Sequence, residues 1–282
     1  MRSHLMFVAA LLLPGIVLQA ETAAERWYFE GAGRLVGART ANGVVPVTSD
    51  VRVFRPGWLG YASLGTWSVK KSKPEPDPAQ GIRKWISESE LEPGRLITIE
   101  ETAVEQGDGA LDLNVNVIVP KEVPVQAAHF VVELPVSMYQ GGQVRFVADN
   151  GEASCVFPDA VPKEPRFLSS NLVKRVVMQA PANGPCVEVV FPVARQVVIQ
   201  DGRYWGGTVY TMYTPVSSNV QGFSALQTKL ACSWEPDRRP VTLRLGGAAG
   251  KTCFDGMGGN FCFALDSPVT EQTVRQLEPA WA

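Results

Sequence analysis

The sequence predicts a mainly β protein: a large antiparallel β-sandwich, followed near the C-terminus by a strand and a helix of a different kind. Three observations predict this fold. From Trp27 to about Leu245, apolar and polar residues alternate in short runs, which is the period of a half-buried strand. Those runs end in Gly, Pro, Asn or Asp, and the chain contains 26 Gly and 21 Pro, which favours many turns. No window in this region sustains an amphipathic helix beyond a few turns.

The first twenty residues predict a secretory signal peptide. Arg2 and His4 give a short polar start, and the apolar run "LMFVAALLLPGIVL" follows, interrupted by Pro14-Gly15. A small residue, Ala20, stands where signal peptidase would cut. We therefore expect export, cleavage after Ala20, and a secreted or periplasmic mature chain; a buried N-terminal helix or membrane anchor is the alternative. No other stretch is long enough to span a membrane, so no membrane partner is expected after cleavage.

Residues 21–247 form the predicted β-sandwich domain. Val51–Phe54 is one predicted strand, and the polar, Pro-rich run Lys70–Pro78 is predicted as an exposed loop. The adjacent acids Glu100 and Glu101 should point to opposite faces of their strand, and we interpret them as solvated charges at its edge. A hairpin with its turn at Gln106–Gly109 is predicted to carry these apolar residues on one face: Ile97, Ile99, Leu111, Leu113, Val115, Val117 and Val119.

Charge and composition exclude several classes of function. The 26 Lys and Arg against 28 Asp and Glu leave a net charge of −2, which argues against nucleic acid as a partner. The mature chain has a single histidine, His129, so a Ser-His-Asp triad would have to use it, and its mid-strand position favours a structural role. We expect no metal site of the Cys/His type and no cofactor.

The five cysteines are compatible with disulfides in an exported protein. Their number is odd, so at least one thiol stays free or pairs outside this chain. No CxxC spacing occurs, and we interpret them as buried structural residues with at most one bridge, Cys155–Cys186 being the favoured pair. The cysteines are Cys155, Cys186, Cys232, Cys253 and Cys262.

Aromatic residues gather in two stretches of this domain. The first is "GWLGYASLGTW", which holds Trp58, Tyr61 and Trp67, and the second is "GRYWGGTVYTMY", residues 202–213. Exposed rings would suit stacking on sugar faces, whereas buried rings would be core and corner residues of the sandwich. Trp205, beside two glycines, is the best candidate for a ring presented on a loop, and we predict it as a substrate-binding residue.

The stretch "CFDGMGGNFCF" (Cys253–Phe263) places dense glycine inside an apolar strand. Such glycines mark a close approach by another backbone or by a ligand. The stretch is not a phosphate loop, because Phe261 stands where the third glycine of GxGxxG would be. Ser267 and Pro268 then suit the start of a helix. A domain boundary is therefore predicted near residues 246–251.

Phe254–Gly259 resembles the opening of the (β/α)8 catalytic barrel of glycoside hydrolase family 30 and its close relatives. In those barrels an aromatic or aliphatic residue precedes x-Gly-x-Gly-Gly on the first strand. The resemblance covers about thirty residues, and 248–282 is assigned to the start of an incomplete barrel. It implies that Gly258 and Gly259 end strand one at the active-site face and leave room for a sugar ring, and that Asn260 offers its amide to a hydroxyl. The alternative is that the glycines only relieve crowding at the barrel rim.

A complete barrel needs about 200–250 residues. The resemblance therefore implies that this chain is the N-terminal portion of a secreted glycoside hydrolase, a retaining O-glycosyl hydrolase acting on polysaccharide or oligosaccharide. Its catalytic carboxylates would lie on the fourth and seventh barrel strands, so no catalytic residue is assigned here. The alternatives are a non-catalytic carbohydrate-binding module and a structural β-sandwich module of the cell envelope. Carbohydrate is the expected partner, and the oligomeric state is left open.

Overall fold

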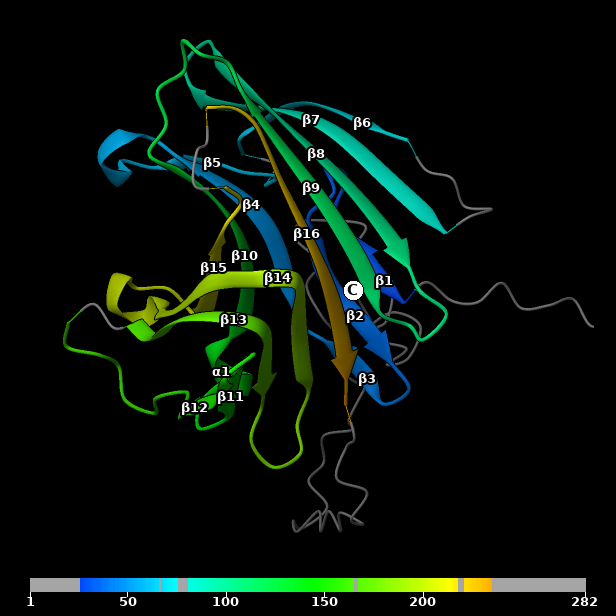
Figure 1. Cartoon of the computed structure of the whole chain (residues 1–282), viewed down its shortest axis with the longest axis vertical. Coiled ribbons are helices and arrows are strands. Elements are labelled where there is room, and N and C mark those ends of the chain that lie inside the picture. The colour runs from blue at the N-terminus through cyan, green and yellow to red at the C-terminus, as the bar shows by residue number, and fades with distance from the viewer. Residues whose placement is uncertain (1–25, 66, 76–80, 165–166, 218–220, 235–282) are drawn as a thin grey trace, which may run out of the picture.

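The computed structural model describes residues 26–65, 67–75, 81–164, 167–217 and 221–234. Most of these residues lie in β-strands (Figure 1), which confirms the predicted mainly β fold. The strands are β1 (Trp27–Phe29), β2 (Leu35–Thr40), β3 (Gly43–Val45), β4 (Thr48–Phe54), β5 (Tyr61–Ala62), β6 (Val69–Pro74), β7 (Ile82–Glu92), β8 (Arg95–Glu105), β9 (Leu111–Val119), β10 (Ala127–Pro135), β11 (Gln143–Ala148), β12 (Gly151–Val156), β13 (Phe167–Gln179), β14 (Cys186–Asp201), β15 (Val209–Pro215) and β16 (Gly222–Ser233). The helical turns are η1 (Pro56–Trp58), α1 (Val136–Tyr139) and η3 (Gly202–Trp205).

The described strands form one continuous antiparallel sheet that curls into two layers (Figure 1). One layer follows the order β1-β2-β4-β10-β15, and the other follows β16-β9-β8-β7-β6. The two layers meet at β14, whose first residues pair with β16 and whose last residues pair with β15. A bulge bends β14 between these halves, because four residues, 191–194, stand opposite the single residue Lys174 of β13. Strands β11 and β12 extend the sheet beyond β13.

The buried faces of the two layers share one hydrophobic core. Val51 and Phe130 of the first layer and Ile99 and Val115 of the second are all fully buried in it. The seven apolar residues predicted to share a face of the β8–β9 hairpin are all buried, which confirms that prediction. The hairpin turn also lies where it was predicted: the Gln106 N–H donates to the Ala110 carbonyl at 2.8 Å.

Two predictions about charged residues were wrong. Lys70–Pro78 was predicted as a loop, but Val69–Pro74 is strand β6, which is exposed and pairs with β7. Lysines on such an edge strand discourage pairing with a further chain, so a polar sequence is compatible with a strand here. Glu101 was interpreted as a solvated edge charge, yet it is fully buried on the core face of β8. Glu100 is half-buried on the opposite face, as the strand alternation requires.

The favoured disulfide Cys155–Cys186 is also wrong, because the two residues are not bonded. Cys155 lies on β12 and Cys186 on β14, with β11 and β13 between them. Three strand spacings amount to about 14 Å, whereas bonded cysteines have Cα atoms no more than about 7 Å apart. Cys253 and Cys262 lie outside the described residues.

Other predictions fall beyond the described part of the chain. The signal peptide at 1–20, the domain boundary near 246–251 and the strand and helix of 248–282 all lie there. Among the residues that the structure does describe, no helix has the length and apolar character needed to cross a bilayer. Within the same ranges, no three acidic, histidine or cysteine side chains are grouped as a metal site would require.

Candidate functional site

A continuous row of aromatic rings lies on one face of the first layer, and we call it the ring row. It starts in the loop before β6, crosses β5 and β4, and ends on β10 and β15. Residues directly opposite in antiparallel strands share a face, and Tyr61 stands opposite Phe54. The row runs Trp67, Tyr61, Phe54, Trp58, His129 and Tyr213, with successive ring centroids 5.3, 5.4, 5.0, 6.1 and 5.9 Å apart.

Two tryptophans of the ring row are presented to solvent. Trp58 is 56% exposed and Trp67 is 62% exposed, although indoles are usually largely buried. Tyr61, Phe54 and His129 are half-buried beneath and between them. The ring row therefore offers flat apolar faces at the surface on a foundation held by the sheet.

The loop that carries Trp58 has an unusual backbone. After β4 ends, Gly57 has φ 70°, Trp58 has φ 60° and Gly60 has φ 124°. Left-handed φ is costly for a bulky residue and often indicates function. The Gly57 N–H donates to the Gln126 side chain at 3.2 Å, and the Arg55 guanidinium donates to the Leu59 carbonyl. These contacts hold the loop in the conformation that exposes the indole of Trp58.

Two substitutions at Trp58 measure this backbone strain. Trp58→Ala and Trp58→Gly remove the same ring, but only glycine adopts φ 60° without a steric cost. We expect Trp58→Gly to be more stable than Trp58→Ala by about 1 kcal/mol, whereas alanine is the more stable choice at ordinary positions. Urea unfolding of the two variants checks this, and the reverse order would show that the loop does not hold Trp58 in a left-handed conformation.

A cavity of about 460 Å³ opens beside the ring row. One wall is formed by Arg55, Gly60, Tyr61 and Trp67, and the other by residues 90–93 at the end of β7. Two of the lining side chains are carboxylates, Glu90 and Glu92. The cavity is widely open to solvent, and its volume and its mixed aromatic and polar lining fall within the range of small-ligand sites.

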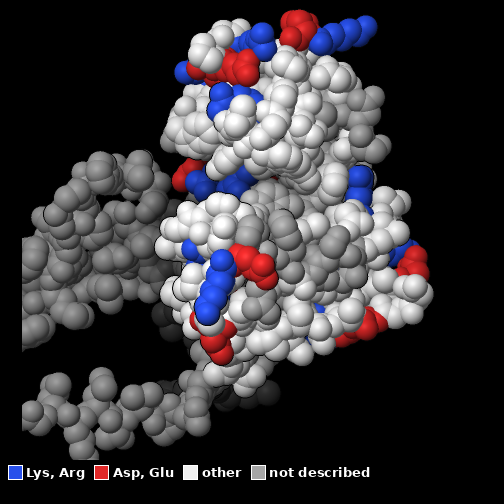
Figure 2. Space-filling view, turned by 90° about the vertical axis from the view of Figure 1, so that its left-hand side faces the viewer, with Lys and Arg blue, Asp and Glu red and all other residues white. Residues whose placement is uncertain are grey.

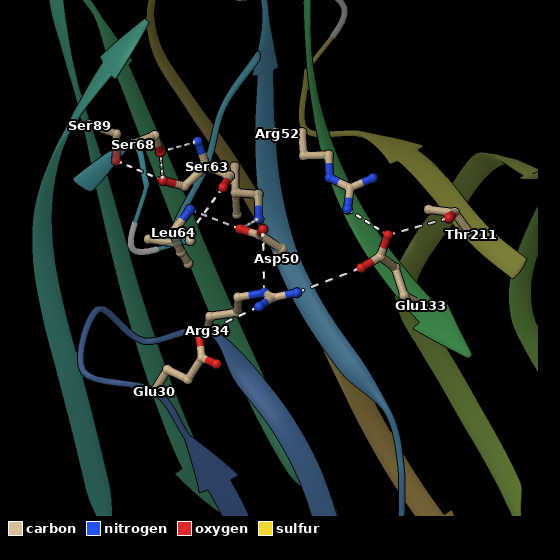
Figure 3. A network of polar contacts seen from close by, with 12 residues as sticks. Glu30, Arg34, Asp50, Arg52, Ser63, Leu64, Ser68, Ser89, Glu133 and Thr211 are labelled. Atoms are coloured by element: carbon tan, nitrogen blue, oxygen red, sulfur yellow. Dashed lines mark hydrogen bonds and ion pairs between the residues drawn. The ribbon is translucent and has the colours of Figure 1, made fainter. Parts of the chain in front are cut away.

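A network of charged groups, drawn in Figure 3, contacts the ring row where Arg52 lies over Tyr61. The Arg52 guanidinium bonds to the Glu133 carboxylate at 2.5 Å and lies over the Tyr61 ring at 4.8 Å. Arg34 bridges Glu133 at 3.7 Å and Asp50 at 3.6 Å (Figure 3). Burial opposes the charge of Arg52, but Glu133 and the neighbouring tyrosines outweigh it, so the pKa of Arg52 is raised. Arg52 is therefore held as a fixed cation under the aromatic surface.

Asp50 ties the loop that carries Trp67 to the sheet. Its Oδ1 accepts from the Leu64 N–H at 2.9 Å and from the Val51 N–H at 2.7 Å. In the same loop, the Ser63 carbonyl accepts from the hydroxyls of Ser68 at 2.6 Å and Ser89 at 2.8 Å (Figure 3). The loop is thus anchored to β4 on one side and to β7 on the other, which fixes the position of Trp67.

His129 contributes a ring to the site and no fixed charge. It stands opposite Arg52 of β4 and Pro215 of β15, and its ring meets the rings of Phe54 and Tyr213 edge-on. Burial lowers the pKa of His129 below its ordinary value, so the neutral imidazole predominates at neutral pH. The interpretation of His129 as a mid-strand residue is confirmed.

Trp205 is also presented to solvent, as a loop position would require. It ends η3 with 54% of its surface exposed, and its ring contacts only that of Tyr204, at 4.8 Å, among the ring contacts of the described residues. It is not joined to the ring row. The predicted sugar-contacting residues Gly258, Gly259 and Asn260 lie outside the described residues.

The first aromatic stretch of the sequence supplied three rings of this site: Trp58, Tyr61 and Trp67. Sequence reasoning missed Phe54, Arg55, Arg52 and Glu133, and assigned His129 no part in a site. Arg52 and Glu133 meet only through the pairing of β4 with β10, and Phe54 meets Tyr61 only through the pairing of β4 with β5, so no local pattern indicates these contacts.

Comparisons with known proteins leave this chain without an assigned family. No protein-family model and no curated protein matches it. Solved structures that are similar in part include a galactose mutarotase related enzyme from Lactobacillus acidophilus, with a TM-score of 0.43 and 8% identity, covering 75% of this chain and 94% of that one. Another is the 4-alpha-glucanotransferase from Thermococcus litoralis, with a TM-score of 0.36 and 13% identity, covering 68% of this chain and 28% of that one. At these TM-scores neither structure defines the function, which has to be inferred from the residues themselves.

Proposed function

We propose that the described β-domain binds carbohydrate at the ring row and its adjoining cavity. The observation that carries this proposal is the pair of exposed indoles, Trp58 and Trp67, held in one row with Tyr61. The C–H faces of a sugar ring pack on such flat apolar surfaces, while its hydroxyls need hydrogen-bonding groups at the edge. Glu90, Glu92 and Arg55 supply those groups in the cavity, and hydrogen bonds to charged groups are the stronger ones.

The expected affinity for a sugar follows from the number of exposed aromatic rings. Each aromatic contact contributes about 0.5–1.5 kcal/mol beyond its buried area. Two or three rings with a few charged hydrogen bonds therefore support a dissociation constant in the range of about 1 mM to 1 μM. Such a site suits a polymer that contacts the domain at many positions.

Tryptophan substitutions test the proposal. We expect Trp67→Ala and Trp58→Ala each to weaken oligosaccharide binding about tenfold, because each removes a stacking face. Isothermal titration with a panel of plant and microbial oligosaccharides measures this on the mature chain. Trp205→Ala is the matched control, since its indole is equally exposed but lies outside the ring row. If Trp205→Ala loses binding while the ring-row variants retain it, the site is at η3, and the proposal is wrong.

We further propose that this domain works as the N-terminal portion of a secreted glycoside hydrolase. The resemblance of residues 251–282 to the start of a glycosidase barrel supports this, together with the signal-like first twenty residues. In that arrangement the domain would hold polysaccharide near a catalytic barrel. Mass spectrometry of the exported protein tests the secretory part: a mature N-terminus at Glu21 is expected, and one that retains Met1 contradicts it.

A further inference from the structure

The two carboxylates that line the cavity already have positive partners. Glu90 bonds to the Lys70 ammonium at 2.7 Å and accepts from the Gly94 N–H at 3.0 Å. Glu92 bonds to the Arg95 guanidinium at 2.8 Å. The pKa of Glu90 is lowered, chiefly by its hydrogen bond with Lys70, so this carboxylate stays ionised and matched. Neither acid leaves the cavity with an uncompensated negative charge.

Arg55, on the opposite wall, has no such partner. Its guanidinium donates to the Leu59 carbonyl, which is neutral, and no carboxylate of the described residues forms an ion pair with it. Gly60 makes room for the guanidinium, because a Cβ there would lie 2.5 Å from an Arg55 nitrogen. The chain thus holds a half-buried cation beside the Tyr61 ring at the cavity wall.

We propose that the cavity binds an acidic sugar, a uronate, whose carboxylate pairs with Arg55. This inference rests on the proposed function and specifies its ligand class. Three cations, Arg55, Lys70 and Arg95, stand against the two carboxylates of the cavity, so the site carries one positive charge in excess. A ligand with one carboxylate balances this charge, whereas an amino sugar would add a second unmatched cation. Arginine presents its N–H donors in a fork that matches a carboxylate. The indole of Trp67 then lies beside the sugar ring, and the paired Glu90 and Glu92 accept from its hydroxyls.

Selectivity for the acid has to come from this one residue. On the described surface that faces the viewer in Figure 2, acidic and basic side chains are interspersed among uncharged residues without a broad patch of either sign. Long-range attraction of a polyanion is therefore weak, and the net charge of −2 opposes it. The charge preference should depend on direct contact with Arg55.

Matched pairs of sugars provide the test. Oligomers of galacturonate, glucuronate and mannuronate are titrated into the mature chain, each beside its neutral, carboxyl-reduced counterpart. We expect at least one uronate to bind about tenfold or more tightly than its counterpart, the scale of one charge-assisted hydrogen bond. Raising the salt concentration should weaken uronate binding and leave neutral binding unchanged.

The Arg55→Gln variant should lose this preference. We expect its affinity for the uronate to fall about tenfold more than its affinity for the neutral counterpart, and Arg55→Lys to be intermediate. Arg145→Gln on β11 removes an exposed arginine elsewhere and should change neither. Because Arg55 also supports the Trp58 loop, the salt dependence of the unmodified protein tests the charge contact independently of that loop.

The outcomes separate the two proposals. If neutral sugars bind as tightly as uronates, or if Arg55→Gln weakens both equally and uronate binding is insensitive to salt, the acidic-sugar proposal is wrong while carbohydrate binding stands. If no sugar of either kind binds, or if sugars bind and Trp58→Ala and Trp67→Ala both leave their affinity unchanged, the proposed function itself is wrong.

Discussion

Replacing Arg52 by methionine is expected to lower the free energy of unfolding by about 3–5 kcal/mol, the cost of breaking a buried ion pair from one side. The side chains of Arg52 and Glu133 are 10% and 12% exposed, and their charged atoms lie 2.5 Å apart. Methionine fills much of the same space but leaves the Glu133 carboxylate, among the residues that the structure describes, with the longer contacts to Arg34 and Thr211. The loss should appear as a lower midpoint of urea unfolding with an unchanged slope.

An exposed ion pair of the same chemistry gives the matched control. Arg175 and Glu188 lie 2.8 Å apart, but their side chains are 45% and 28% exposed, so Arg175→Met should cost no more than about 1 kcal/mol. The double variant Arg52→Met/Glu133→Met should recover at least half of the loss, since it removes the unmatched carboxylate. A loss for Arg52→Met no larger than for Arg175→Met would show that the network under the ring row does not stabilise the fold.

Replacing Glu101 by methionine is expected to raise the free energy of unfolding by about 1–3 kcal/mol, the cost of a buried polar group without a partner. Glu101 is fully buried on β8, and neither carboxylate oxygen has a hydrogen-bond partner among the described residues. Burial, and secondarily the nearby Asp50, raise the pKa of Glu101 well above its ordinary value. Methionine has a similar length and belongs in the surrounding hydrophobic core.

The stability gained by replacing Glu101 should increase as the pH rises. Since the pKa of Glu101 is higher in the folded than in the unfolded chain, the folded chain binds more protons between these two values. The stability of the unmodified protein therefore falls as pH rises from the ordinary glutamate pKa toward the folded one. Glu101→Gln should match the unmodified protein at low pH and exceed it at high pH, while Glu101→Met is the most stable throughout. Denaturant unfolding from pH 4 to 9 checks this, and a destabilised Glu101→Met at every pH would mean that the carboxyl group is satisfied.

The strands of this fold are predictable where one face is apolar and the other polar. The β8–β9 hairpin shows this, because apolar residues recur at every second position around a clear turn, interrupted on the core face of β8 by Glu101. Strand β6 could not be predicted in this way, since an edge strand of Lys and Ser buries too little to leave a pattern. The burial of Glu101 could not be predicted either, because local sequence shows which face of a strand a residue points to but not what covers that face.

The candidate site was only partly predictable because its residues are distant in sequence. Trp58, Tyr61 and Trp67 stand within ten positions, and that clustering was visible. The bond between Arg52 and Glu133 joins residues 81 positions apart, and that between Arg52 and Tyr213 spans 161. Such pairs are set by the order and register of β4, β10 and β15, which no local pattern specifies.

The central claim is that the ring row is a carbohydrate-binding surface, and tryptophan side-chain NMR tests it most directly. The indole N–H resonances of the mature chain can be assigned with the Trp58→Ala, Trp67→Ala and Trp205→Ala variants and followed during titration with the tightest-binding oligosaccharide. We expect the resonances of Trp58 and Trp67 to shift together with one saturation curve, and that of Trp205 to stay in place. Saturable shifts confined to Trp205, or to indoles outside the ring row, would contradict the claim.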